Sequence, residues 1–535
     1  MALNSRILRN AKLNKFNLSH TYTSTCDMGY LLPVACIEVL PNDWFRIRDE
    51  FLARFLATLA PVMHIFDIEL RWWFTPTRLV FNKWQDFITG GPDGNDSTVL
   101  PFITAPKEGF AVGSLMNRLG VPHSVPNIKV SALPARVYNL IRNEFYRNEM
   151  LQDAVPVSME PGEDTITNVN LLRACWERDY YTQAQPSPQK GPEVSIGLGG
   201  TAPVYGNGMT LGFTGVGANN VKVNSGLSAG AFNGVAVPRY TDQVFGKPVG
   251  SNTIETGTDS TGLAGFTSVG LSEDPAKSGV VADLSQASAV TINALRYASA
   301  VQQFQEANAL TGNRYPEFIP AQYGVFCPDA SLQRPQYIGG MKSPMVISEV
   351  LQTSATNTES PQGNMAGHGV SAGISPEIRF HAREFGYLMC LMTIRPKTAY
   401  FQGIPKFMSR ETRYDYAIPI FAHIGAQAIK NKEIFATGTA EDDKVFGYTL
   451  RDDDYRFIPN MVTGQMTKTL DFWTAARKFA EAPKLNSKFV ESDPTTRIFA
   501  VEDAQNSDHI VFQIAHHIKA LRPLPKQGVP GMHII

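Results

Sequence analysis

Apolar and polar residues alternate with a period of two near both ends of the chain, and this pattern limits the fold more than any other feature. In Asp67–Phe74 the apolar residues alternate with Asp67, Glu69 and Arg71, and His509–Leu521 repeats the alternation. This period is typical of a half-buried β-strand. Tyr387–Ile394 is apolar at nearly every position, which predicts a strand covered on both faces.

Three segments have helical signals. Asp43 is a candidate N-cap for a helix to about Leu59, Pro134 stands at a favoured first helical position, and a longer helix is predicted from about Leu284 to Leu310, ending at Gly312. Strands interrupted by helical and loop insertions differ from a repeating βαβ pattern. They predict a mainly β protein built on a β-sandwich with excursions.

A Gly-rich stretch at 191–279 contains 19 of the 43 glycines, few charges and no sustained periodicity. A structureless loop of this length is uncommon inside a compact domain. Two interpretations remain open: a disordered segment, or a protrusion that is ordered by neighbouring molecules. The low charged fraction of 18% favours a loop-rich protein whose surface is partly covered by partners.

The chain length of 535 residues would suggest several domains, although a sandwich with large insertions can reach it as one. We predict a basic N-terminal arm (1–30), a first set of strands with helical insertions (31–190), the Gly-rich insertion (191–283), and the remaining strands with helical insertions and a basic C-terminal tail (284–535).

Positive charge is concentrated at the two ends of the chain, although the net charge is only −1. The first acidic residue is Asp27, and no acidic residue follows Asp508. The ends are either solvated tails or segments that face a polyanion. On the second interpretation the candidate nucleic-acid-binding residues are Arg6, Arg9, Lys12, Lys15, Lys519, Arg522 and Lys526.

The cysteines and the N-terminal residues indicate the cellular compartment in which the protein folds and assembles. The five cysteines are an odd number without a C-x-x-C pair, which argues against a disulfide framework or a zinc site and for assembly in a reducing cytoplasm. The N-terminus lacks the apolar run of a signal peptide. No window approaches the ~20 apolar residues of a membrane span; Phe51–Phe66 comes nearest and contains Arg54 and His64.

Two catalytic or nucleotide-binding motifs occur only as chance matches. Gly226-Leu-Ser228-Ala-Gly230 has the G-x-S-x-G pattern, but the nucleophile elbow needs a strand before the serine and a helix after it, and the flanking VKVN and AFNG offer no helix. Gly197-x-Gly199-x-x-Ala202 is followed at once by Pro203, so no helix N-terminus can hold a pyrophosphate.

Two further groups of titratable residues have ordinary explanations. Asp452–Asp454 lacks the spacing of a calcium loop and indicates a solvated loop, with a cation at a subunit contact as the alternative. His516 and His517 fall on opposite faces of the last strand and have no carboxylate or cysteine near them in sequence. They indicate packed or interfacial histidines rather than metal ligands. We predict no catalytic residue, cofactor or metal ligand.

Several blocks in a fixed order resemble the major capsid protein of the microviruses, and of the gokushovirus type in particular. The resemblance is carried by KFNLSHTYTSTCDMGYLLPV, WWFTPTRLVFNKWQDFITGG, NLLRACWERDYYTQAQPSPQKGPEVSIGLGG, SAVTINALRYASAVQQFQEANALTGNRYPEFI, MSRETRYDYAIPIFAHIGAQAIKNKEIF and VFGYTLRDDDYRFIPNMVTGQM. One departure is Ser187, which stands where many relatives carry Trp.

The resemblance implies a single eight-stranded antiparallel jelly roll with large loop and helix insertions. It implies pentamers and a sixty-subunit T=1 icosahedral shell around a circular single-stranded DNA genome. The 191–279 stretch would form a three-fold protrusion able to contact a host receptor. The basic ends, which include Lys15 and Lys519, would lie together on the inner surface. DNA-binding, pilot and scaffolding proteins of the virus are expected partners, with the virion as location after assembly in the host cytoplasm.

Two functions from other classes compete with the capsid interpretation. A β-sandwich can serve as a glycan- or receptor-binding module that forms no shell, because fold alone does not fix function. A hydrolase built on Ser228 is the other alternative, and it depends on the chance-like motif alone.

Overall fold

The computed structural model describes most of the chain. The described residues are 12–192, 194, 204–206, 213–214, 243–244, 247–248, 270–271, 280–282, 292–311, 314–351, 365–501 and 508–527. They fall into two compact units, one made of Met1–Pro192 with Gln303–Ile535 and the other of Glu193–Gln302.

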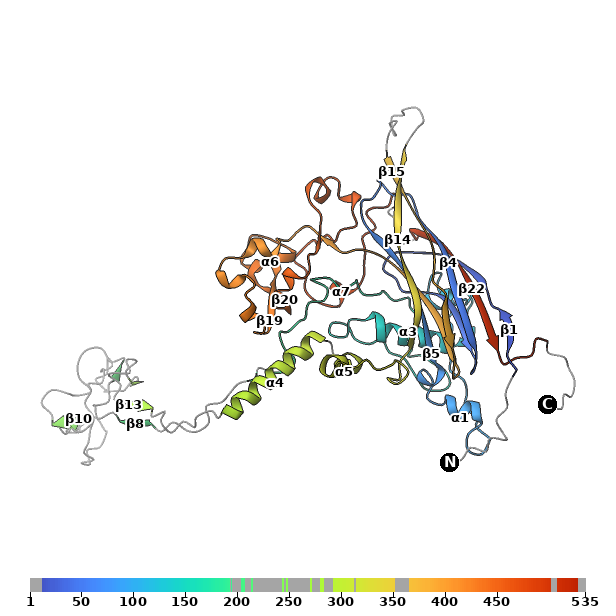
Figure 1. Ribbon diagram of the computed structural model, residues 1–535, viewed down its shortest axis with the longest axis horizontal. Helices are drawn as coiled ribbons and strands as arrows, with labels where there is room; N and C mark the ends of the chain where they lie inside the picture. The colour runs from blue at the N-terminus through green and yellow to red at the C-terminus, as the bar shows by residue number, and fades with distance from the viewer. Residues whose placement is uncertain are drawn as a thin grey trace, which may run out of the picture. The chain divides into compact units, whose positions relative to one another are not determined.

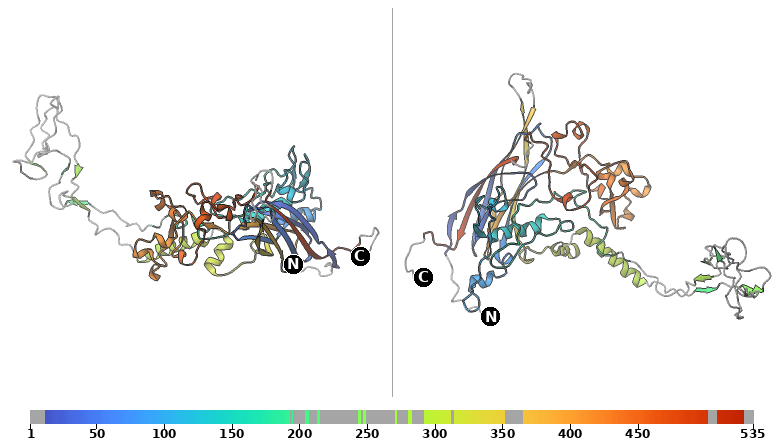
Figure 2. Two further views of the ribbon diagram at one scale, coloured as in Figure 1. Left: turned by 90° about the horizontal axis from the view of Figure 1, so that it is seen from above. Right: turned by 180° about the vertical axis from the view of Figure 1, so that it is seen from behind.

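The described residues of the first unit form a main antiparallel sheet of ten strands, which confirms the mainly β prediction. Figures 1 and 2 show these strands side by side in a curled layer. The strands are β1 (Asn14–Asn17), β2 (His20–Cys26), β3 (Leu32–Val39), β4 (Trp44–Phe55), β5 (Phe66–Pro76), β14 (Gln336–Leu351), β15 (Met365–Ile374), β16 (Ile378–His381), β17 (Gly386–Pro396) and β22 (Ile510–Arg522).

The strand order is β1-β22-β4-β15-β14-β5-β17-β3. β2 also pairs with β22, and β16 also pairs with β4. The long β14 connects the two halves of the sheet, because its first part pairs with β5 up to Met345 and its second part pairs with β15 from Val346 onward. The two halves curl over one hydrophobic core that takes residues from both.

The core forms because one side of each strand is apolar at every second position. On β22 the buried residues run from Ile510 through Phe512 and Ile514 to Ala520, and the residues between them are exposed or half-buried, as the alternation predicts. They meet Trp72 and other residues of β5 and β17 in the same core. Each fully buried Phe or Ile side chain contributes about 1.5–3 kcal/mol.

The helix predicted from Asp43 to about Leu59 is wrong, because this segment forms β4. Its burial alternates residue by residue from Trp44 to Phe55. Phe51, Leu52, Phe55 and Leu56 also fit a helical stripe, which misled the prediction. Pairing with β22 over twelve residues decides the conformation, since the tertiary contacts of a strand outweigh local propensity.

A second core covers the outer face of β5 and β17. The helix α3 (Leu133–Ile141) lies there, with Pro at its first turn as predicted. It packs against Trp73, Met389 and Leu391, which explains why Tyr387–Ile394 is apolar on both faces. The Tyr138 hydroxyl donates a 2.8 Å hydrogen bond to the Leu31 carbonyl at the end where β3 begins.

Figure 1 also shows the shorter elements outside the main sheet. The helices are α1 (Trp84–Thr89), α2 (Leu115–Arg118), α5 (Tyr315–Tyr323), α6 (Asn431–Ile434) and α7 (Ser487–Val490), with η3 (Arg142–Tyr146) directly after α3. The strand pairs are β6 (Phe102–Thr104) with β7 (Lys129–Ser131), β18 (Ala399–Tyr400) with β21 (Asn460–Met461), and β19 (Ala426–Lys430) with β20 (Val445–Leu450).

The long helix α4 (Ile292–Thr311) confirms the predicted helix from Ile292 onward, while residues 284–291 and Gly312 lie outside the described residues. In the second unit the described strands pair as β8 (Val204–Gly206) with β13 (Val280–Ala282), β9 (Phe213–Thr214) with β12 (Gly270–Leu271), and β10 (Gln243–Val244) with β11 (Lys247–Pro248). Ser228 lies outside the described residues.

Asp67 and Glu69 were predicted on the solvated face of a half-buried strand, but both are buried. They form ion pairs with cations from both neighbouring strands and from the residue after β17. Lys342 lies 3.0 Å from Asp67, Lys397 lies 2.9 Å from Asp67, and Arg395 lies 3.0 Å from Glu69. A buried carboxylate persists where paired cations and hydrogen bonds compensate its lost hydration. The sequence pattern could not show these partners, which come from β14, from β17 and from Lys397 directly after β17.

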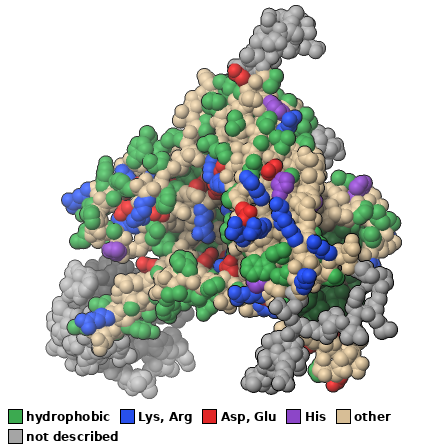
Figure 3. All heavy atoms as spheres, turned by 45° about the vertical axis from the view of Figure 1, so that its right-hand side comes forward, with side chains coloured by type: hydrophobic (Ala, Val, Ile, Leu, Met, Phe, Trp, Pro, Cys, Tyr) green, Lys and Arg blue, Asp and Glu red, His purple; other side chains and the backbone are tan. Residues whose placement is uncertain are grey.

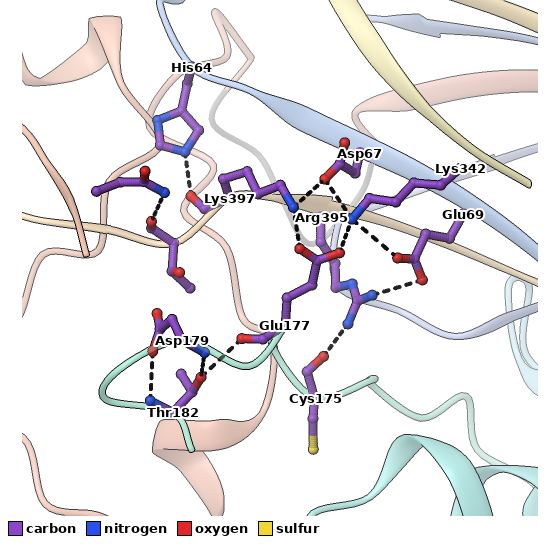
Figure 4. A network of polar contacts seen from close by, with 12 residues as sticks. His64, Asp67, Glu69, Cys175, Glu177, Asp179, Thr182, Lys342, Arg395 and Lys397 are labelled. Carbon is purple, nitrogen blue, oxygen red and sulfur yellow. Dashed lines mark hydrogen bonds and ion pairs between the residues drawn. The ribbon is translucent and has the colours of Figure 1, made fainter. Parts of the chain in front are cut away.

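Glu177 covers this cluster from the segment that follows α3 and η3 (Figure 4). Its carboxylate bonds both Lys342 and Lys397, while Arg395 donates to the Cys175 carbonyl. Burial alone would raise the pKa of Glu177, but the two lysines outweigh it and lower the pKa to about 2. The cluster thus holds residues 175–177, in the block that carries the family resemblance, against the outer face of β5.

Candidate nucleic-acid interface

The structure brings two of the predicted basic residues from opposite ends of the chain onto neighbouring strands. β1 pairs with β22 so that Lys15 lies opposite Leu521 and Asn17 lies opposite Lys519. Lys15 and Lys519 are both exposed on the same face of the sheet. The expectation that the ends lie side by side is therefore met for these two lysines.

A row of cations crosses the sheet on this exposed face. Lys519 of β22 lies opposite Arg46 of β4, and Arg46 lies opposite Arg379 of β16. All three side chains are exposed. Neighbouring strands lie about 4.8 Å apart, so the backbone positions of these three cationic residues fall within about 10 Å. We call Lys519, Arg46 and Arg379 the cation row.

Like charges directly opposite each other on paired strands destabilise a sheet. Arg379 is partly neutralised by Glu377 at 2.6 Å. The hydrogen bond from Arg379, and after it the positive charges of Arg379, Arg46 and Lys519, lower the pKa of Glu377. In the part of the chain that the structure describes, neither Arg46 nor Lys519 forms an ion pair with a carboxylate. The row therefore remains net positive and favours an anionic partner.

The next positions along the strands extend the same face. Arg48 of β4 lies opposite His517 of β22, and both are exposed. His517 also lies 3.4 Å from Glu50. Figure 3 shows a band of Lys and Arg side chains, with histidines beside it, on the side of the molecule where β4 and β22 lie in Figure 1.

The remaining predicted residues fall in different places. Arg522 points to the other face, because it is three positions from Lys519 in a period-two strand; it pairs with Asp43 at 3.2 Å and donates to the Glu38 carbonyl. Lys526 and Lys12 are exposed in the described segments beyond β22 and before β1. Arg6 and Arg9 lie outside the described residues.

Sequence reasoning missed Arg46, Arg48 and Arg379. The first two stand in the segment Trp44–Phe55, which was interpreted as a helix, and the alternation Arg46-x-Arg48 against Phe45-x-Ile47 was the available signal. For Arg379 the sequence gives no such signal, because its place in the row depends on the register between β16 and β4.

A buried hydrogen-bonded group fixes β22 to β4 directly beneath the exposed face. His516 Nδ1 lies 2.7 Å from Asp49 Oδ1, and the Trp72 indole donates to Asp49 Oδ2 at 2.7 Å. The Ser375 hydroxyl accepts from the Asp49 amide at 2.8 Å. His516 is buried while His517 is exposed, which confirms their predicted placement on opposite faces, although a carboxylate does lie close to His516 in space.

The acidic run at Asp452–Asp454 is less solvated than predicted. Asp453 is buried, accepts a 2.6 Å hydrogen bond from Thr449 and pairs with Arg456 at 2.7 Å. Asp454 pairs with Arg410. The prediction of a solvated loop is therefore wrong for Asp453, because its carboxylate binds a threonine hydroxyl and an arginine instead of water.

A cavity of about 770 Å³ lies between the outer face of β5, the segment around Glu177, and α5. Its lining carries arginines, among them Arg71, Arg147 and Arg334, and about as many acids, among them Glu69, Glu144 and Glu317. This balance distinguishes it from the cation row, because it creates no net attraction for a polyanion.

The described residues contain no cluster of three or more potential metal ligands, and no helix among them is long and apolar enough to span a membrane. All five cysteines are described, and they are free thiols.

Comparison with known proteins gives consistent matches over almost the whole chain. Residues 5–532 match a family model described as capsid protein (F protein). The chain is 33% identical to the capsid protein VP1 of Chlamydia phage 1, over 98% of this chain and 96% of that protein. It is 34% identical to the capsid protein VP1 of Bdellovibrio phage phiMH2K, over 97% and 95%. It is 28% identical to the capsid protein VP1 of Spiroplasma virus 4, over 98% and 96%.

Proposed function

We propose, from the premise that this chain belongs to the capsid protein (F protein) family, that sixty copies of it build a T=1 icosahedral shell around a circular single-stranded DNA genome. Membership in this family makes the chain a structural capsid protein of a virion that assembles with copies of itself, and not an enzyme. The hydrolase alternative at Ser228 therefore has no support.

The finer fold that we propose is an eight-stranded jelly roll. The order of the strands supports it: one sheet would contain β1 with β2 as a single strand, then β22, β4, and β15 with β16 as a single strand, and the facing sheet would contain β14, β5, β17 and β3. β1 and β2 both pair with β22, and β15 and β16 both pair with β4, so each of these two pairs is counted as one strand. First and last strands are neighbours in a jelly roll, as β2 and β22 are in this chain.

We assign the genome contact to the exposed face of β22, β4 and β16. The single observation that carries this assignment is the cation row Lys519, Arg46 and Arg379, in which like charges lie on adjacent strands. Repulsion between these like charges lowers the stability of the free subunit, and bound phosphates would offset this repulsion. The contact would be electrostatic and independent of base sequence. Lys15 adds charge one row away, and the basic ends with Arg6, Arg9, Lys12, Arg522 and Lys526 remain proposed contributors.

The test is DNA packaging by the double variant Arg46→Gln with Lys519→Gln. The proposal predicts shells that assemble but contain much less DNA, measured as the ratio of absorbance at 260 and 280 nm of purified particles. Wild-type DNA content in the variant would contradict the assignment of the genome to this face.

For the contact between copies we propose the segment 404–461. It exposes Ile420 by 78%, Ile458 by 87% and Phe407 by 60%, together with exposed tyrosines stacked with arginines, such as Arg410 over Tyr455. Aromatic residues, Met and Arg are enriched in protein interfaces. The occupant is a second copy of this chain, because the family assembles as a shell. Ile420→Asp with Ile458→Asp is expected to leave a folded subunit that forms no particles, while Val112→Asp, equally exposed outside this segment, leaves assembly intact.

Host contact through the Gly-rich insertion 191–283 stays a proposal, as do the assembly site in the host cytoplasm and the viral pilot and scaffolding partners. Deletion of 200–270 tests the host contact: the proposal predicts intact particles that adsorb poorly to the host, and unchanged adsorption would contradict it.

A further inference from the structure

An exposed aromatic pair borders the cation row on the same face of the sheet. Trp44 of β4 and His381 of β16 are register partners, and their rings stack in near-parallel planes, 13° apart, with centroids 4.0 Å apart. His381 covers one face of the indole, yet Trp44 remains 48% exposed. A large aromatic side chain left this exposed on a strand is a candidate for contact with a partner.

The backbone around this pair is held in place by local hydrogen bonds. His381 Nε2 is hydrogen-bonded to Asn42 Oδ1 at 3.1 Å, which sets the plane of the imidazole. Asn42 adopts a left-handed conformation, and the buried Asp43 accepts a 2.9 Å hydrogen bond from the Leu40 amide. The Asn42 amide in turn donates to the Ala382 carbonyl at 2.8 Å. The indole therefore stands on a fixed turn, and a ligand that stacks on it need order little of the protein.

Cations lie next to the free indole. Arg46 is two positions along β4, about 6.8 Å away on the same face, and Lys519 and Arg379 flank it on the adjacent strands. Lys15 belongs to the same register row as Trp44, with Leu521 between them. A flat apolar ring bordered by positive charges on one exposed face matches an unpaired nucleobase with its flanking phosphates.

We propose that Trp44 and His381 form a stacking site for an unpaired base of single-stranded nucleic acid. The inference rests on the proposed genome contact and deepens it by naming the chemical group that is bound. The base stacks on the free part of the indole, while the neighbouring phosphates contact Arg46 and Lys519. The base pairs of a duplex stack on one another, so the site distinguishes single strands from double strands.

The experiment uses the full-length chain as unassembled subunits and measures binding of two oligonucleotides at fixed salt by fluorescence anisotropy. One is an oligothymidylate, and the other is an abasic oligonucleotide with the same number of phosphates. The wild type is expected to bind the oligothymidylate about 5- to 150-fold more tightly, the range of one stacked base. In Trp44→Leu the difference is expected to vanish while affinity for the abasic strand stays unchanged. Trp44→Phe, which keeps a ring, is expected to recover part of it.

The outcomes separate the inference from the function on which it rests. Equal binding of both oligonucleotides by the wild type would overturn the stacking site and leave the electrostatic genome contact standing. Equal losses for both oligonucleotides in Trp44→Leu would also overturn it, because they would indicate a general disturbance of the face. Binding of neither oligonucleotide by the wild type would overturn both the stacking site and the genome face.

Discussion

Lys519 of β22 lies directly opposite Arg46 of β4, and both side chains are exposed on one face of the sheet. Cross-strand pairs are the unit of sheet stabilisation, and a like-charged pair opposes it. A capsid subunit that retains such a pair gives up some stability for attraction to a polyanion. Removing the like-charged pair should therefore raise the stability of the subunit and weaken its binding of DNA. Both effects can be measured on the same variant.

The first prediction concerns Arg46→Glu. An opposite charge facing Lys519 is expected to stabilise the unassembled subunit by about 0.2–1 kcal/mol. The same change is expected to weaken binding of single-stranded DNA. It should also reduce the slope of log K against log salt, because fewer counterions are released when fewer phosphates are contacted. Chemical unfolding and a salt titration measure the two effects.

Lys107→Glu is the matched control for this charge reversal, because Lys107 is exposed in a turn that is not part of β4, β16 or β22. It changes the net charge equally and should leave the salt slope close to that of the wild type. If both variants reduce the slope alike, net charge and not the cation row determines binding.

A second prediction concerns the buried pair beneath the face. Asp49→Ala removes the partner of both His516 Nδ1 and the Trp72 indole. Removing the carboxylate leaves both buried groups without this partner, which is expected to lower the free energy of unfolding by about 1–3 kcal/mol for each. His517→Ala, on the exposed side of the same strand, should change it by only about 0.5 kcal/mol. Similar effects of the two substitutions would contradict the role given to Asp49.

The third prediction is a pH dependence. Lys342 and Lys397 lower the pKa of Glu177 to about 2, below its ordinary value of 4.5. A carboxyl whose pKa is lowered by folding contributes stability above its unfolded pKa, and this contribution is lost as the pH falls from about 4.5 towards 2. Glu177→Gln should therefore be less stable than the wild type at pH 6, and the difference should shrink towards pH 2. A constant difference across this range, in unfolding midpoints, would rule out the linkage.

A fourth prediction compares two glycines with nearly the same backbone angle φ. Gly29 (φ +85°) has the Ser492 carbonyl oxygen 2.3 Å from where a Cβ would stand, whereas Gly162 (φ +83°) has open space there. Gly162→Ala is expected to cost only the left-handed strain, about 1–2 kcal/mol. Gly29→Ala adds overpacking of about 1–3 kcal/mol. Equal melting temperatures of the two variants would contradict this, because they would show that the backbone around Ser492 shifts at no cost to make room for the methyl group.

The sequence predicts a strand well where the spacing of its apolar residues fits a period of two and no helical period. In His509–Leu521 most apolar residues occupy every second position and are buried there, although Val511 and Leu521 are apolar and exposed. The segment from Trp44 to Phe55 alternates too, but its apolar residues near Phe51 and Phe55 also fit a helical stripe. Local pattern cannot choose between two periods that both fit, and the long pairing with β22 does.

The candidate site was predictable only in part, because the cation row is a product of register. Lys15 and Lys519 could be proposed from the charge of the chain ends. Arg379 joins the row through pairing with β4, more than 300 residues earlier in the sequence. For the same reason Asp67 and Glu69 seemed solvent-exposed in sequence, since the lysines and arginine that allow their burial come from distant strands.

The measurement that tests the central claim most directly is an electron cryomicroscopy map of DNA-filled particles formed by the full chain. The account predicts a shell of sixty copies with the exposed face of β4 and β22 directed inward, and density for nucleic acid within contact distance of Lys519, Arg46 and Arg379. A map in which this face lies on the outer surface, or is covered by a neighbouring subunit without nucleic-acid density, would contradict it.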